Sequence, residues 1–293
     1  MFRTSAVRPA LPGAVSALLL LATSIGVGGT PAQGAQPCDP AVTFDPGSFS
    51  DPTTIDNPYL PMVPGTRLVL KGQADRGGGL TAHRVVSTVT DLTKVINGVT
   101  SRVVMDRDIS ESVLAELELS FYAQDDAGNV WNLGEYPEEY QDGVRIGAPS
   151  TWFAGLQDAQ AGIHMLANPR KDRPRYLQGS VPRIEFLDCA KVFETGLRTC
   201  TGAGCFDDVL VTDETSPLDS GNAHQRKFHA PGVGIVKVSA INDPERETLV
   251  LTEIIHLSAK QLKDVRTTAR QMDERGCSVK PLYCKTPPVR RSP

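Results

Sequence analysis

Long apolar segments are scarce in this chain of 293 residues. The one that comes close, Ala14–Val27, has fourteen residues, fewer than the about 20 that a membrane-spanning helix needs. Arg3 and Arg8 precede it and small residues follow it, which is the pattern of a secretory signal cleaved near Ala35. We therefore predict that residues 1–35 are a signal peptide and that the protein is secreted or extracytoplasmic, with no transmembrane segment in its mature form.

An excess of positive charge is also absent. The formal net charge is −4, and loss of the two arginines with residues 1–35, which hold no acidic residue, makes it −6. Nucleic acid phosphates select for clusters of lysine and arginine. The charge therefore argues against a nucleic acid partner.

The common catalytic and metal-binding signatures are missing too. The sequence has no Gly-x-Ser-x-Gly elbow, His-Glu-x-x-His helix, P-loop or dinucleotide fingerprint. It has no Cys-x-x-Cys, no histidine within ten residues of a cysteine, and only five scattered histidines. We expect no metal and no cofactor, and the balance leans away from an enzyme.

Six cysteines are present, and all follow the predicted signal peptide. An even count in an exported chain favours disulfides, although six cysteines allow about 15 pairings and sequence alone does not choose among them. The short spacings suggest Cys200–Cys205 and Cys277–Cys284, which leaves Cys38 with Cys189.

Aromatic residues make up only 6% of the chain, so their clustering carries weight. Several gather in "FYAQDDAGNVWNLGEY", residues 121–136, and Trp152 with Phe153 follows soon after. Core packing is the usual role of such residues, and a cleft with a few polar anchors is the functional alternative. The candidate binding residues are Tyr122, Trp131, Glu135, Trp152 and His164.

Two series of strand-like segments flank a less regular centre. Segments rich in β-branched residues and separated by turns lie at 66–72, 82–91, 100–110, 113–124 and 129–136, and again at 189–198, 206–215, 224–230, 234–241 and 247–256. In 113–124, apolar Leu117, Leu119 and Phe121 alternate with polar residues, including Glu116 and Glu118, which predicts one buried face and one solvated face. Asn97-Gly98 predicts a hairpin turn, and 121–136 should be a hairpin released by Gly128.

Together these patterns predict a mainly β protein, with antiparallel meanders at about 66–136 and 189–256 forming a large twisted sheet or half-barrel. We expect a proline-rich arm at 36–65, a single β-rich domain at 66–276, and an irregular middle with a short helix within 152–169. A capping box at Ser258 and Gln261 begins an amphipathic helix over about 259–275, and Gly276 should end it. Residues 277–293 should form a disulfide loop and a disordered tail.

The runs Tyr-Ala-Gln-Asp…Gly-Asn-Val-Trp, from Tyr122, and Ala-Pro-Gly-Val-Gly-x-Val, from Ala230, resemble an uncharacterised family of secreted bacterial β-rich proteins. The resemblance covers about 57–256 and implies export and an all-β core, but no established activity. The chain departs from this family at Gly179, Leu187 and Gln225, where relatives carry acidic residues. That departure makes an enzyme less attractive for this chain.

Three functions remain open from the sequence. The leading hypothesis is a non-enzymatic exported protein that binds an apolar or amphipathic ligand at the aromatic corner. A hydrolase, perhaps carbohydrate-active, that uses paired carboxylates is the first alternative, since Asp and Glu are plentiful. A structural protein of the cell envelope, with an envelope component as its partner, is the second.

Overall fold

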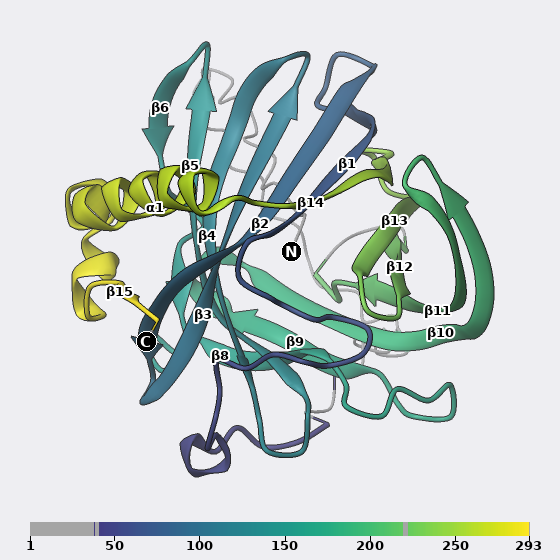
Figure 1. Ribbon diagram of the computed structural model, residues 1–293, viewed down its shortest axis with the longest axis horizontal. Coiled ribbons are helices and arrows are strands. Elements are labelled where there is room, and N and C mark those ends of the chain that lie inside the picture. The colour runs from purple at the N-terminus through teal and green to yellow at the C-terminus, as the bar shows by residue number, and fades with distance from the viewer. Residues whose placement is uncertain (1–37, 39–40, 219–221, 293) are drawn as a thin grey trace, which may run out of the picture.

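The computed structural model describes residue 38, residues 41–218 and residues 222–292. The predicted signal peptide, residues 1–35, lies outside the described residues. The described chain is mainly β, with 54% of residues in strands (Figure 1). The twelve main strands are β1 (Thr66–Asp75), β2 (Leu80–Ile96), β3 (Val99–Ser110), β4 (Val113–Gln124), β5 (Val130–Gln141), β8 (Gln160–Met165), β9 (Tyr176–Val181), β10 (Phe186–Thr201), β11 (Gly204–Thr215), β12 (His224–Ala230), β13 (Gly234–Ile241) and β14 (Thr248–His256).

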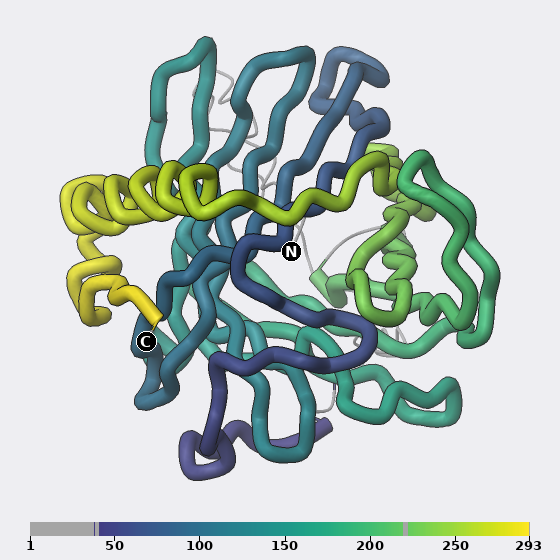
Figure 2. The backbone as a smooth tube through the Cα atoms, in the orientation of Figure 1, coloured from purple at the N-terminus to yellow at the C-terminus, as the bar shows by residue number. Residues whose placement is uncertain are grey.

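These strands close into an antiparallel barrel. Neighbouring strands follow the order β1-β14-β13-β12-β11-β10-β9-β8-β5-β4-β3-β2, and β1 pairs with β2 from Arg67↔Thr88 to Asp75↔Leu80, which completes the ring (Figure 2). The predicted half-barrel is therefore wrong in one respect, because the barrel is closed. Closure pairs the backbone groups that two sheet edges would otherwise expose. The sequence of a single strand does not predict that β1 pairs with both β2 and β14.

The predicted hairpins are present. Asn97 and Gly98 join β2 to β3 with φ of 47° and 82°, which is the conformation that a tight hairpin turn requires. The aromatic stretch at 121–136 forms the end of β4, a turn with Gly128 at φ 92°, and the start of β5.

The short helix expected within 152–169 is wrong. This segment holds β7 (Trp152–Phe153), a turn and β8, both strands pairing with β5. Gly162 explains part of the difference, since a Cβ there would lie 2.2 Å from the backbone carbon of Gln178. The glycine thus permits close contact between β8 and β9, and a helix at this segment would not need such a contact. A small strand β6 (Val144–Gly147) also pairs with β5.

The C-terminal helix α1 (Ala259–Val279) begins as predicted, because the Ser258 hydroxyl accepts from the Gln261 backbone N–H and the Gln261 side-chain oxygen accepts from the Ser258 backbone N–H. It buries Val265, Ala269 and Met272. The helix continues past Gly276, which was expected to end it. A Cβ at Gly276 would lie 2.5 Å from the Tyr283 ring, so this glycine provides space for the following segment to fold back.

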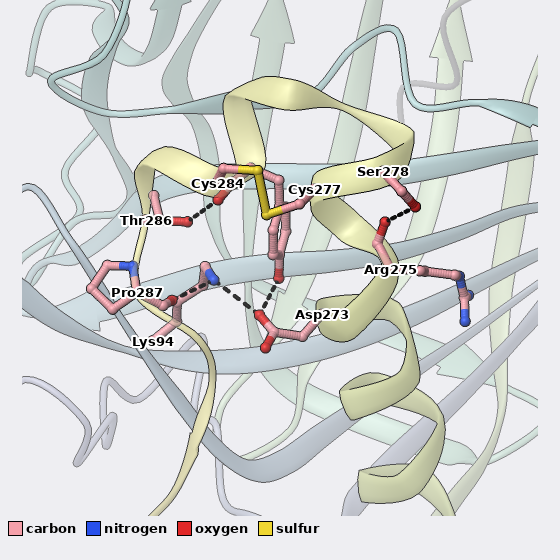
Figure 3. Close-up of a disulfide and its surroundings, with 9 residues drawn as sticks. Lys94, Asp273, Arg275, Cys277, Ser278, Cys284, Thr286 and Pro287 are labelled. Atoms are coloured by element: carbon pink, nitrogen blue, oxygen red, sulfur yellow. Dashed lines mark hydrogen bonds and ion pairs between the residues drawn. A yellow bond between two sulfur atoms is a disulfide. The ribbon is translucent and has the colours of Figure 1, made fainter.

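That following segment is ordered, contrary to the disordered tail predicted. Residues Pro281–Lys285 form the 3-10 helix η3, and β15 (Arg290–Arg291) pairs with β2. Figure 3 shows the Cys277–Cys284 disulfide above Lys94, whose ammonium donates to Asp273 at 3.0 Å and to the Pro287 carbonyl at 2.6 Å. A buried lysine with two partners holds this end of the chain against β2.

The two faces of the sheet carry different chemistry. Apolar side chains of β3 and β4, such as Met105, Leu117 and Leu119, pack with Val265 and Met272 of α1 on the outside. On the opposite face, one buried cluster joins strands around the ring, which identifies this face as the barrel interior. Its strand members are Val89, Val104, Tyr122, Val130, Met165, Val192 and Leu210, and Ile55, Leu60 and Met62 of the N-terminal arm join them.

The polar face of β4 is therefore not solvated. Glu118 is 4% exposed and Ser120 is fully buried, because the sheet curls around them. The prediction of one wet face was wrong for this strand, since alternation distinguishes two faces but does not say which of them meets water.

Candidate functional site

A row of carboxylates crosses the interior face of three adjacent strands. Asp106 on β3 lies directly opposite Glu118 on β4, and Ser120, two residues along β4, lies opposite Glu135 on β5. The three side chains are 7%, 4% and 9% exposed. Like charges placed opposite one another on a sheet are destabilising, so this arrangement needs a reason.

The burial changes how these groups hold protons. Burial, reinforced by the nearby Glu135 and Asp106, raises the pKa of Glu118 to about 8. Burial also raises the pKa of Asp106, and it raises that of Glu116, where Glu118 and Asp108 add to the effect. Glu118 therefore holds a proton at neutral pH that an ordinary carboxyl group would release.

Glu135 and Trp152 meet at one end of the row. The Trp152 indole N–H donates to Glu135 at 3.1 Å, and the Asn132 amide donates at 2.7 Å. Gly134 makes this contact possible, since a Cβ there would lie 2.6 Å from the Trp152 carbonyl oxygen and its φ is 155°. Two of the predicted site residues, Glu135 and Trp152, are thus joined by a direct hydrogen bond.

Tyr122 and His164 form the next contact, with ring centroids 5.2 Å apart. Burial raises the pKa of Tyr122, and the charges of Glu135, Asp106 and Glu118 raise it further, so Tyr122 borders the carboxylate row. Burial lowers the pKa of His164 well below its ordinary value, which makes this ring neutral. Tyr122 on β4 therefore connects the carboxylate row to His164 on β8, the strand that pairs with β5.

Trp131 lies apart from these four residues. Its ring packs against Phe44 and Phe49 of the N-terminal arm, and its indole N–H donates to Asp125 at 2.9 Å. Trp131 is thus part of the contact between the arm and the outer face of the sheet.

A second polar group lines the wall formed by β8, β9, β11 and β12. The Gln178 amide donates to the His164 carbonyl at 3.3 Å and to Glu214 at 3.4 Å. The Lys227 ammonium lies 2.5 Å from the other oxygen of Glu214. Burial alone would raise the pKa of Glu214, but Lys227 outweighs it and the pKa falls to about 2. This pair is therefore ionised and internally compensated.

Several buried polar atoms near these groups have no hydrogen-bond partner within the described structure. They include Asp106 Oδ1, His164 Nδ1, Gln178 Oε1 and the Tyr176 hydroxyl. Buried polar atoms are normally satisfied by protein, water or ligand, and each unsatisfied one costs about 1–3 kcal/mol. The interior thus presents unused hydrogen-bonding capacity from β3, β8 and β9.

Asp106, Glu118, Gln178 and Tyr176 were not among the residues predicted for the site. One signal was available: Asp106 and Asp108 share parity on one strand, Glu116 and Glu118 share parity on the next, and a tight hairpin places such residues opposite one another. Without knowledge of ring closure, these charges resembled an ordinary solvated face.

A separate pocket of about 200 Å³ lies on the outside, between α1 and the strands beneath it. Arg67, Arg107, Asp264 and Thr268 are among its lining residues. Arg67 already donates to Thr88 at 3.0 Å, and acidic and basic groups are mixed there. This pocket offers no set of groups directed at one kind of ligand.

The cysteine pairs are Cys38–Cys189, Cys200–Cys205 and Cys277–Cys284, the pairs that the spacing suggested, and no described cysteine is free. Disulfides persist in oxidising compartments, and the protein is extracytoplasmic. No described helix has both the length and the apolar character needed to span a membrane. In the described ranges, no three His, Cys, Asp or Glu side chains are arranged to hold a metal ion.

No family model matches the chain, and no curated protein matches it. Among solved structures, the chain is similar to a Bacteroides fragilis exported protein with a YmcC-like fold, at 16% identity and a TM-score of 0.36, covering 68% of this chain and 99% of that one. It is also similar to a Parabacteroides distasonis lipoprotein, at 16% identity and a TM-score of 0.32, with the same coverage.

Proposed function

We propose that this protein is an exported, non-enzymatic binding protein that holds a small amphipathic ligand inside its barrel. One observation carries the proposal: buried hydrogen-bonding atoms on two walls of the interior, Asp106 Oδ1 on one and His164 Nδ1 and Gln178 Oε1 on the other, have no partner within the described structure. A ligand between the two walls would satisfy them.

The interior side chains support an amphipathic ligand more than a purely apolar one. Apolar interior side chains such as Val104 and Leu210 pack against one another and against Met62 of the arm. The unused capacity belongs to carboxyl, imidazole, amide and hydroxyl groups. The ligand therefore needs polar groups, with apolar parts that contact Tyr122 and its neighbours.

Native mass spectrometry of the mature protein, purified from its own secretion route, tests this proposal. The expected result is a mass above that of the oxidised chain, with a small molecule released on denaturation. A protein of the bare oxidised mass, prepared without dialysis or a denaturing step, would contradict it. In that case a structural role in the envelope becomes the better explanation, and assays for hydrolysis follow.

A further inference from the structure

Several other buried carboxylates of this protein have a basic partner, whereas the carboxylates of the row have none within the residues that the structure describes. Elsewhere, Glu138 lies 2.6 Å from Arg275, Glu214 lies 2.5 Å from Lys227, and Asp273 lies 3.0 Å from Lys94. Within the described ranges, no lysine, arginine or histidine forms an ion pair with the carboxylates of the row.

The neighbours that the row does have are neutral. Ser120 donates to Glu118 at 2.8 Å, while Asn132 and Trp152 donate to Glu135. The second oxygen of Asp106, Oδ1, is buried and accepts nothing from the described residues. Removing carboxylates from water without a counter-charge is costly. The row therefore offers a binding position for a cationic group.

Aromatic groups stand beside the carboxylates. Trp152 is hydrogen-bonded to Glu135, and Tyr122 lies on the same face of β4 as Glu118. Carboxylates beside aromatic rings are the chemistry that recognises an organic ammonium group, through charge-assisted hydrogen bonds and contact with the ring faces. Across from Tyr122, His164 and Gln178 supply hydrogen-bonding atoms for the rest of such a molecule.

From this arrangement we propose that the ligand is a small organic amine, whose protonated nitrogen binds between Asp106, Glu118 and Glu135. This inference rests on the proposed function and specifies the class of molecule. Glu118 faces the carboxyl groups of Asp106 on β3, Glu116 on its own strand and Glu135 on β5. Since the pKa of Glu118 is about 8, amine binding at neutral pH displaces a proton, so binding should strengthen toward mildly alkaline pH.

Isothermal titration of the mature protein with spermidine tests the amine, with 1,8-octanediol as a neutral molecule and Mg²⁺ as a compact cation. The key variant is Asp106→Asn combined with Glu118→Gln, which keeps side-chain shape and removes charge. Glu253→Gln is the control, because Glu253 is half exposed and pairs with Lys71 on the surface. We expect spermidine to bind, the double variant to weaken it at least about tenfold, and the control to leave it unchanged.

Spermidine binding that survives the double variant, or equal binding of Mg²⁺ or the diol, would overturn the inference. Failure of spermidine at about 1 mM, together with a non-amine molecule in the native mass spectrum, would overturn it while leaving the proposed function intact. Failure of spermidine with an empty native spectrum would overturn both.

Discussion

Replacing Glu118 with glutamine should make the folded protein more stable at neutral and alkaline pH. The folded state keeps the Glu118 proton until about pH 8, whereas the unfolded chain releases it near its ordinary pKa of 4.5. The stability that this difference contributes is complete below pH 4.5 and is lost as the pH rises toward 8. Integrated over that interval, the loss amounts to at most about 5 kcal/mol.

Guanidinium unfolding followed by tryptophan fluorescence measures this effect, because Trp131 and Trp152 are both buried. Wild type should lose stability from mildly acid to alkaline pH, and Glu118→Gln should remove several kcal/mol of that loss. Ser120 can still donate to the glutamine oxygen, so the hydrogen bond persists. Burial lowers the pKa of His83, but Asp108 and Glu247 outweigh this effect and raise the pKa to about 9. His83 therefore contributes a decline in stability of the same sign in both proteins as the pH rises.

The comparison of wild type with the variant therefore isolates Glu118. Glu253→Gln, on the surface, should follow the wild-type profile. Identical pH profiles for wild type and Glu118→Gln would refute the reasoning, since Glu118 would then lack the buried, carboxylate-lined surroundings described above.

Other substitutions test the contacts that hold the barrel and its coverings together. Arg275→Ala removes the guanidinium group that donates to both oxygens of the fully buried Glu138, and it should cost about 3 kcal/mol in chemical unfolding. The control Arg198→Ala removes an exposed ion pair and should cost no more than a few tenths of a kcal/mol, about the value of a surface pair. Removing Cys38–Cys189, which joins residues 151 apart, should cost about 5 kcal/mol, whereas removing Cys200–Cys205, 5 apart, should cost about 2 kcal/mol; equal losses would contradict the loop-closure argument. Gly162→Ala should cost about 3 kcal/mol by forcing β8 from β9, and an unchanged melting temperature would contradict that close contact.

Local chemistry predicted the elements that depend on neighbours in sequence. The turn at Asn97-Gly98, the hairpin around Gly128 and the capping box at Ser258 each follow from a few adjacent residues. The middle segment was misjudged because Gly162 acts through a partner strand remote in sequence.

The candidate site shows the same limit. Aromatic scarcity directed attention to Tyr122, Glu135 and Trp152, which lie beside the interior polar groups. Asp106 and Glu118 were missed because their burial depends on ring closure between β1 and β2, a long-range pairing. A charged residue on an alternating strand is read as solvated unless the second face is known to be enclosed.

A high-resolution crystal structure of the mature protein, purified without removal of bound small molecules, tests the central claim most directly. The account predicts non-protein density inside the barrel, in contact with Asp106 and Glu118 on one side and His164 and Gln178 on the other. An interior in which these side chains turn to protein partners of their own, with no density between them, would contradict it.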